Sequence, residues 1–155
     1  MKEFEIEFRR ATREDLPEIV QMLAADFLGT TRERYENPLP ESYTKAFEEI
    51  DADKNNELIV AEKDGEIVGT LQITFTPSIS FQGGKRATVE SVRVDENYRG
   101  QGFGKELMKW AINRAREENC VAMQLTTNSD RKDAHRFYKD LGFKGTHLGM
   151  KLYLK

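Results

Sequence analysis

The segment that most restricts the fold of this chain is a glycine-rich turn that joins an apolar stretch to a helical one. It reads VRVDENYRGQGFGK over residues 92–105, with glycine at every second position of the turn: Gly100, Gly102 and Gly104. Glycines allow positive φ and remove the Cβ atoms that would block a ligand. The helix that follows supplies free N–H groups and the positive end of its dipole. The segment therefore predicts a strand–turn–helix that binds an anion.

The alternative for this segment is a turn that uses glycine only for tightness. The flanking Arg99 and Lys105 favour phosphate binding instead. A P-loop requires a hydroxyl residue after Gly-Lys, and here Glu106 follows, so a P-loop is excluded. The dinucleotide fingerprint Gly-x-Gly-x-x-Gly does not match this Gly-x-Gly-x-Gly spacing, which argues against a nicotinamide site and a nucleotide-binding module.

Hydrophobic periodicity predicts ten elements in the order β-α-α-β-β-β-α-β-α-β. Strands are expected over residues 5–9, 58–61, 67–75, 87–94 and 121–126, and in a tail where Leu148, Met150, Leu152 and Leu154 alternate with polar residues. Asp64-Gly65 is a hairpin signal, Thr12 with Asp15 marks a helix start, and Gly142 ends the last helix. The pattern predicts an α/β (α+β) fold with a mixed sheet and helices on both faces. No linker divides the 155 residues, so a single domain over residues 1–155 is expected.

Charge and cysteine content narrow the class of protein. The 24 Lys plus Arg against 27 Asp plus Glu give a net charge of −3, which argues against duplex nucleic acid as a partner. Cys120 is the one cysteine, so a disulfide framework and a Cys-rich zinc site are excluded, and no metal is expected. The apolar runs fall far short of the ~20 residues that span a bilayer, and the charged N-terminus lacks a secretory signal. A cytoplasmic protein without a membrane anchor is expected.

Two segments resemble the GNAT superfamily of acyl-CoA-dependent N-acyltransferases. Arg99-x-x-Gly102-x-Gly104 resembles its pyrophosphate loop, and AHRFYKDLGF over residues 134–143 is similar to its Ala-x-x-x-Tyr-x-x-x-Gly-Phe ending. With the element order, the resemblance spans nearly all of the chain. It implies a GNAT-like fold, whose central mixed, mostly antiparallel sheet contains a parallel, splayed strand pair.

The resemblance also implies acetyl-CoA as the acyl donor, bound along the strand before the turn and by backbone N–H groups of the turn. The residues implied are Val92, Arg93, Val94, Arg99, Gly100, Gln101, Gly102, Phe103, Gly104 and Lys105. Family members often carry an Asn seven residues before the tyrosine, where this chain has Arg131. Asn128 lies ten residues before Tyr138, and the sequence leaves open which of the two contacts the CoA arm.

Two side chains are candidates for proton transfer. Tyr138 occupies the tyrosine position of the family and is the candidate acid for the departing thiolate; the alternative is a core aromatic. Glu90 is the candidate base, directly or through water, on one strand face with Val92. Apolar surroundings would raise its pKa; the alternative is a surface glutamate. The family suggests the N–H of Val92 or a neighbour as the donor to the thioester oxygen.

The activity implied is transfer of an acetyl group to a primary amine of a small molecule or peptide, by direct attack in a ternary complex. The alternative is a non-catalytic CoA-binding sensor or scaffold of the same fold. The acceptor is expected between residues 29–40, the second helix and residues 77–85, where acidic residues such as Asp26 and Glu33 suit a cationic amine and Arg32 and Arg34 suit a carboxylate. Family members are commonly dimers, so a homodimer is one expected arrangement.

Overall fold

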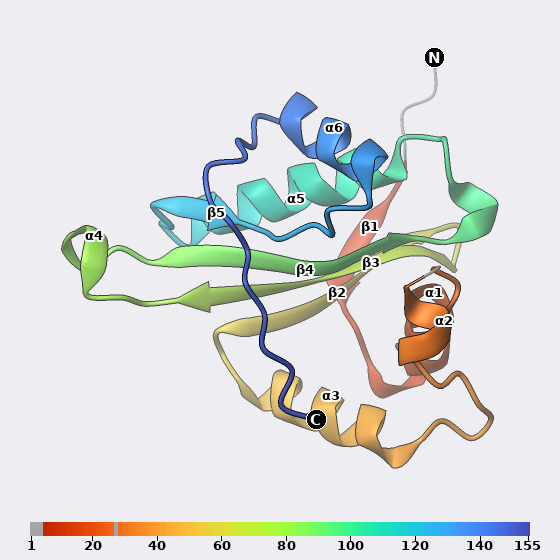
Figure 1. The fold of residues 1–155 in the computed structure, drawn as a ribbon. Coiled ribbons are helices and arrows are strands. Elements are labelled where there is room, and N and C mark those ends of the chain that lie inside the picture. Colours follow the sequence, from red (N-terminus) through yellow and green to blue (C-terminus); the bar gives the residue numbers. More distant parts are fainter. Residues whose placement is uncertain (1–4, 27) are drawn as a thin grey trace. The chain divides into compact units, whose positions relative to one another are not determined.

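The computed structural model of the chain describes residues 5–26 and 28–155, so the first four residues of the charged N-terminus lie outside the described residues. The chain divides into two compact units, Met1–Gln124 and Leu125–Lys155. Figure 1 shows the elements of each unit in chain order. No helix in the described ranges is both long and apolar enough to cross a bilayer.

The first unit is built on a five-stranded sheet in the order β1-β2-β3-β4-β5. The strands pair antiparallel from β1 to β4, and β4 and β5 pair in parallel, which confirms the mixed, mostly antiparallel sheet. Asp64 and Gly65, at φ 52° and 79°, form the predicted two-residue turn between β2 and β3. The strand bounds are β1 Glu7–Arg10, β2 Asn56–Lys63, β3 Glu66–Thr76, β4 Arg86–Val94 and β5 Ala122–Gln124.

The parallel pair is short. Arg86, Ala87 and Thr88 of β4 pair with β5, and residues 89–94 of β4 continue beyond the last paired residue. Along that stretch the edge of β4 opposite β3 has no strand partner among the described residues. The two parallel strands, β4 and β5, therefore pair only near their starts, as the predicted splayed pair does, and the second half of β4 has an open edge.

Helices cover both faces of this sheet, as predicted (Figure 1). On one face, Leu16, Ile19, Ala11 and Val60 form a buried cluster that Phe47 joins from α3. The Thr12 N–H donates to Asp15 Oδ2 at 2.7 Å and so begins this segment as predicted. The elements on this side are η1 Arg13–Asp15, α1 Leu16–Ala24, α2 Gly29–Arg32 and α3 Glu41–Ala52. A further short helix, α4 Ser80–Gly83, connects β3 to β4.

The opposite face is covered by α5 (Phe103–Glu117), whose Leu107, Met108 and Ala111 are fully buried. The helix packs closely on the sheet at Gly69 of β3. A Cβ atom at residue 69 would lie 2.7 Å from Leu107 Cδ1 and 3.1 Å from the Arg93 carbonyl oxygen. Because real Cβ atoms are essentially never as close as 2.7 Å to a neighbour, α5 packs here against bare backbone.

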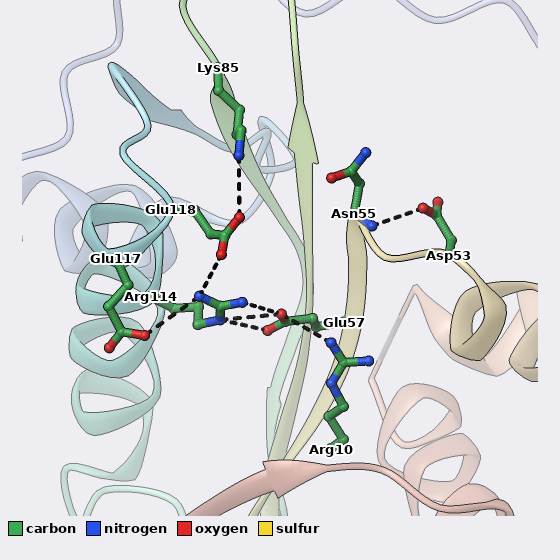
Figure 2. A network of polar contacts seen from close by, with 8 residues as sticks. All are labelled: Arg10, Asp53, Asn55, Glu57, Lys85, Arg114, Glu117 and Glu118. Carbon is green, nitrogen blue, oxygen red and sulfur yellow. Dashed lines mark hydrogen bonds and ion pairs between the residues drawn. The ribbon is translucent and has the colours of Figure 1, made fainter.

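A buried polar network lies at the other end of α5 (Figure 2). Glu57 of β2 is 3% exposed and accepts from Arg114 Nη2 at 2.6 Å and from Arg10 Nη2 at 3.3 Å. The Arg114 guanidinium also stacks over the Phe75 ring, 5.2 Å from its centroid. Glu118 extends the network by accepting from Arg114 and from Lys85. The network joins β1, β2, α5 and the start of β4.

The second unit contains α6 (Lys132–Asp140) and an extended tail. The helix ends in a Schellman motif: the N–H of Phe143 donates to the Tyr138 carbonyl, and the N–H of Gly142, at φ 101°, donates to the Lys139 carbonyl. The Tyr138 and Phe143 rings meet edge to face at 5.9 Å. The Tyr-x-x-x-Gly-Phe spacing thus has a structural cause, because it places the left-handed residue and the apolar contact of this cap.

The predicted last strand is wrong. Residues 145–155 form no strand, and Leu148, Met150, Leu152 and Leu154 are 83–88% exposed. Alternation shows which side chains would share a face, but a strand also needs a neighbouring backbone with which to pair. Local pattern alone does not supply that partner.

Candidate functional site

The glycine-rich turn and the start of α5 form the predicted anion-binding turn. Gly102, at φ 88°, is the N-cap of α5, and the Glu106 N–H donates to its carbonyl at 3.2 Å. The preceding N–H groups, of Phe103, Gly104 and Lys105, belong to the first turn, where a helix has no carbonyl to offer them. Three N–H groups and the positive helix end therefore converge on one turn, which suits a phosphate group.

The side chains of the turn divide into two groups. Arg99, Gln101 and Lys105 are exposed, and Arg99 Nε lies 3.4 Å from the Val94 carbonyl oxygen. Phe103 is 2% exposed, and its ring contacts Tyr98 of η2 (Glu96–Tyr98) edge to face at 5.8 Å. Phe103 therefore fixes the helix start in the core, and only its backbone is in a position to face a ligand.

A β-bulge precedes the turn in β4. Gln72 of β3 is opposite Glu90, and Thr70 is opposite Arg93, so Leu71 alone faces the two residues Ser91 and Val92. Ser91 adopts φ 55°, a left-handed conformation that lets the strand accommodate the extra residue. Because Gln72 and Thr70 share one face of β3, their partners Glu90 and Arg93 share one face of β4.

The bulge corrects two predictions about Glu90. Sequence alternation placed Glu90 and Val92 on one face, but the extra residue puts Arg93 there instead. The Glu90 side chain is exposed, so the apolar surroundings predicted for its carboxylate are not found. Within the part of the chain that the structure describes, the Glu90 carboxylate takes part in no side-chain hydrogen bond or ion pair, which leaves it open to an amine or a water molecule.

Arg93 connects the bulge to the end of α1. Its Nη2 lies 3.1 Å from Asp26 Oδ2, and its Nη1 donates to the Val92 carbonyl at 2.9 Å. Asp26 is 8% exposed and is therefore not the solvent-facing acid that was predicted to attract an amine. The sequence carries no local signal for this ion pair, because Asp26 and Arg93 lie far apart in the chain and their contact depends on how α1 packs on the sheet.

The segment between α2 and α3 is fixed by Tyr43. Its hydroxyl donates to Glu33 Oε1 at 2.9 Å and accepts from the Arg34 N–H at 3.0 Å, and burial raises the pKa of Tyr43. Arg34 itself is paired with Glu36 at 2.8 Å. The charged residues predicted to select an acceptor are thus largely paired with one another.

In the second unit, Tyr138 is half-buried, with Phe137 and Phe143 against its ring at 5.2 and 5.9 Å. Asn128 Oδ1 accepts from the Asp130 N–H at 2.8 Å, and Arg131 is the N-cap of α6. His135 Nε2 lies 2.9 Å from the Asn128 carbonyl oxygen. Asn128 and Arg131 therefore shape the turn before α6, and their contact with CoA stays a prediction, as does the role of Tyr138.

Cys120 is half-buried, and burial raises the pKa of its thiol. A raised pKa leaves little thiolate at neutral pH, so the geometry does not favour a nucleophile. The described ranges contain no group of three or more His, Cys, Asp or Glu side chains arranged to hold a metal ion.

Comparison with known proteins places these features in one family. Residues 17–143 match the model of the Acetyltransferase (GNAT) family. An aminoalkylphosphonate N-acetyltransferase from Salmonella typhimurium is 28% identical over 142 residues, which cover 91% of this chain and 86% of that protein. The match continues across both units, from α1 to the Gly142-Phe143 cap.

Two solved structures share the fold. A protein from Bacillus halodurans described as a transcriptional regulator is 55% identical, with a TM-score of 0.94 over 97% of this chain and 100% of that one. A predicted acetyltransferase from Clostridium acetobutylicum, solved with acetyl-CoA, is 20% identical, with a TM-score of 0.73 over 96% of each chain.

Proposed function

Because this chain belongs to the acetyltransferase (GNAT) family, we propose that it transfers an acetyl group from acetyl-CoA to a primary amine. The proposal covers a cytoplasmic enzyme whose single domain is residues 1–155, and the family match across both units supports that extent. Attack is direct, with acetyl-CoA and the amine bound together.

The observation that carries the proposal is the open edge of β4 running into the glycine turn. The turn offers the N–H groups of Phe103, Gly104 and Lys105 to the CoA pyrophosphate, since N–H groups at a helix start suit phosphate. The open edge, residues 89–94, offers strand-like hydrogen bonds to the pantetheine amides. Together they hold the thioester near the bulge, where the N–H of Val92 or its neighbour stabilises the developing oxyanion.

Glu90 is the proposed base. A primary amine with a pKa of about 10.4 is largely protonated at neutral pH, so it must lose a proton before it attacks. The Glu90 carboxylate is exposed on the face of the sheet that carries α1 and takes this proton directly or through water.

Tyr138 is the proposed acid that protonates the CoA thiolate. Its ring is held by the α6 cap, so the position of its hydroxyl is fixed within the second unit. This role rests on the family's tyrosine position, and a phenol is a suitable donor to a thiolate.

A CoA-binding regulator without catalysis is the second candidate, favoured by the description of the Bacillus halodurans protein as a transcriptional regulator. Under this alternative, CoA binds at the same turn and no amine is acetylated. Direct contact with duplex DNA has less support, because a net charge of −3 does not supply the phosphate contacts that DNA binding requires.

The test is a thiol-release assay with acetyl-CoA and a panel of amines: aminoalkylphosphonates, polyamines, amino acids, aminoglycosides and peptide N-termini. Calorimetric titration of CoA accompanies it. Binding with amine-dependent thiol release supports the enzyme, binding without release for any amine supports the regulator, and absence of CoA binding contradicts both.

A further inference from the structure

The ion pair between Asp26 and Arg93 lies beside the bulge, next to the open edge of β4. The neighbouring backbone hydrogen bonds show which groups of β4 face that edge. The Asp95 N–H donates to the Val68 carbonyl of β3 at 2.9 Å. Because backbone groups of a strand alternate between its two edges, residues 93 and 95 face β3, and the carbonyls of Val92 and Val94 point to the open edge.

Arginine side chains engage both of these carbonyls. Arg93 Nη1 lies 2.9 Å from the Val92 oxygen and Arg99 Nε lies 3.4 Å from the Val94 oxygen. With the carbonyls engaged, the edge presents mainly N–H donors, which suit a ligand rich in carbonyl oxygens. The thioester and pantetheine amides of acetyl-CoA are such a ligand.

Asp26 holds the more buried of these two arginines. Its carboxylate, 8% exposed, takes the second arm of the Arg93 guanidinium at 3.1 Å, while its carbonyl accepts the N–H groups of Gly29 and Thr30 that begin α2. A guanidinium binds in two fixed directions at once, so the positions of the Asp26 carboxylate and the Val92 carbonyl are coupled.

Resting on the proposed acetyl transfer, we propose that Asp26 is a positioning residue: through Arg93 it holds the Val92 carbonyl and thereby restricts the backbone of Val92, whose own N–H is the donor proposed at the bulge. The Val92 N–H is separated from the held carbonyl only by the two soft backbone torsions of Val92, so holding that carbonyl limits the directions that this N–H can take. Asp26 contacts neither substrate, and its effect is on turnover rather than on CoA affinity.

The chain offers a matched control at the other end of α1. Asp15 is 6% exposed and is paired with Arg9 Nη1 at 2.7 Å, yet it lies at the helix start, where the paired arginine belongs to β1. Asp26→Asn and Asp15→Asn each remove one buried carboxylate from an arginine. Arg93→Lys keeps a cation beside Asp26 but loses the second arm that reaches Val92.

The experiment measures kcat and KM with acetyl-CoA and the best amine of the panel, together with hydrogen exchange of amides 92–94 by mass spectrometry. Asp26→Asn and Arg93→Lys are expected to lower kcat about 10- to 100-fold, as a displaced catalytic geometry does, and to speed exchange of these amides. Asp26→Asn should keep KM for acetyl-CoA within about twofold, and Asp15→Asn should keep kcat within about twofold.

The positioning role is overturned if Asp26→Asn or Arg93→Lys keeps wild-type kcat, or if Asp15→Asn lowers kcat equally at the same loss of thermal stability. If Asp26→Asn does not fold, Arg93→Lys decides alone. A wild type that neither binds nor turns over acetyl-CoA contradicts the proposed function, and the exchange data then report separately whether Asp26 orders the bulge.

Discussion

Arg114 Nη2 lies 2.6 Å from Glu57 Oε2 and so links the last turns of α5 to the beginning of β2. The Glu57 carboxylate is 3% exposed and also accepts from Arg10. Two guanidinium groups therefore depend on one buried carboxylate, while the start of α5, at the other end of the same helix, carries the predicted anion-binding turn.

Glu57→Gln should destabilise the protein strongly, because it leaves two guanidinium groups beside a neutral amide. The expected loss is about 3–5 kcal/mol of unfolding free energy, measured by urea denaturation. Glu117→Gln is the control: Glu117 also pairs with Arg114, at 3.5 Å, but is 68% exposed, and its loss should stay within about 0.5 kcal/mol. Equal losses for the two variants would contradict the structural role of the buried pair.

Gly102→Val should weaken CoA binding about tenfold or more, since a branched side chain would occupy the place where the pyrophosphate approaches the backbone. Gly83→Val is the control, because Gly83 has a similar φ, 78° against 88°, and precedes β4, at the opposite end of that strand from the glycine-rich turn. Both variants should lose about 1–2 kcal/mol from backbone strain. Calorimetry that finds the same CoA affinity in both would place the phosphates elsewhere.

Tyr138→Phe removes one hydroxyl and keeps the ring contact with Phe143 that closes the α6 cap. The fold and the CoA affinity should be retained, while kcat falls by about 10²–10⁴-fold, or less where water protonates the thiolate. Tyr153→Phe, at an 81% exposed position of the tail, should have wild-type turnover. Unchanged kcat in Tyr138→Phe would remove the tyrosine from the mechanism.

Glu90→Gln should lower kcat/KM mainly near neutral pH. The deficit should shrink as the pH rises toward the amine pKa of about 10, because the free amine then forms without a base. The measurement is kcat/KM against pH for the wild type, Glu90→Gln and the exposed control Glu14→Gln. A profile of Glu90→Gln that matches the wild type would show that water or another group takes the proton.

The stability should depend on pH through Asp15. Hydrogen bonds from Arg9 and from the Thr12 N–H lower the pKa of Asp15 below its usual value of about 3.9. A lowered native pKa means that this stabilisation is complete above about pH 5 and is lost as the pH falls through the native pKa. The gap in unfolding free energy between wild type and Asp15→Asn should therefore be widest at neutral pH and narrow in acid; a constant gap in urea titrations would contradict this.

The sequence predicted best those features that a few neighbouring residues determine. The Thr12–Asp15 helix start, the Asp64-Gly65 hairpin and the Gly142 helix end each depend on backbone requirements within a few positions, and all three are confirmed. The family resemblance and the mixed sheet are confirmed as well.

Features that depend on distant partners were not predictable. The bulge is formed by Ser91 at a positive φ, and a serine in the sequence does not indicate this conformation. The sequence therefore predicted that Glu90 shares a strand face with Val92, whereas it shares one with Arg93. The sequence predicted Asp26 as an exposed acid, whereas the packing of α1 on the sheet places its carboxylate beside Arg93. The tail alternates like a strand but forms none, and the sheet of the described residues does not include it. The roles of Glu90, Tyr138, Asn128 and Arg131 stay predictions.

The absence of a side chain at Gly69 determines how near α5, the helix that carries the predicted anion site, can come to the sheet. Leu107 fills the space that any larger residue would need, and the carbonyl of Arg93 lies on the other side of the same small gap. The distance between α5 and the sheet is therefore set by Gly69, the smallest residue of β3. A change in the shape of the predicted anion site therefore has little freedom to come from a movement of α5, and has to come from the loops and the open strand edge instead.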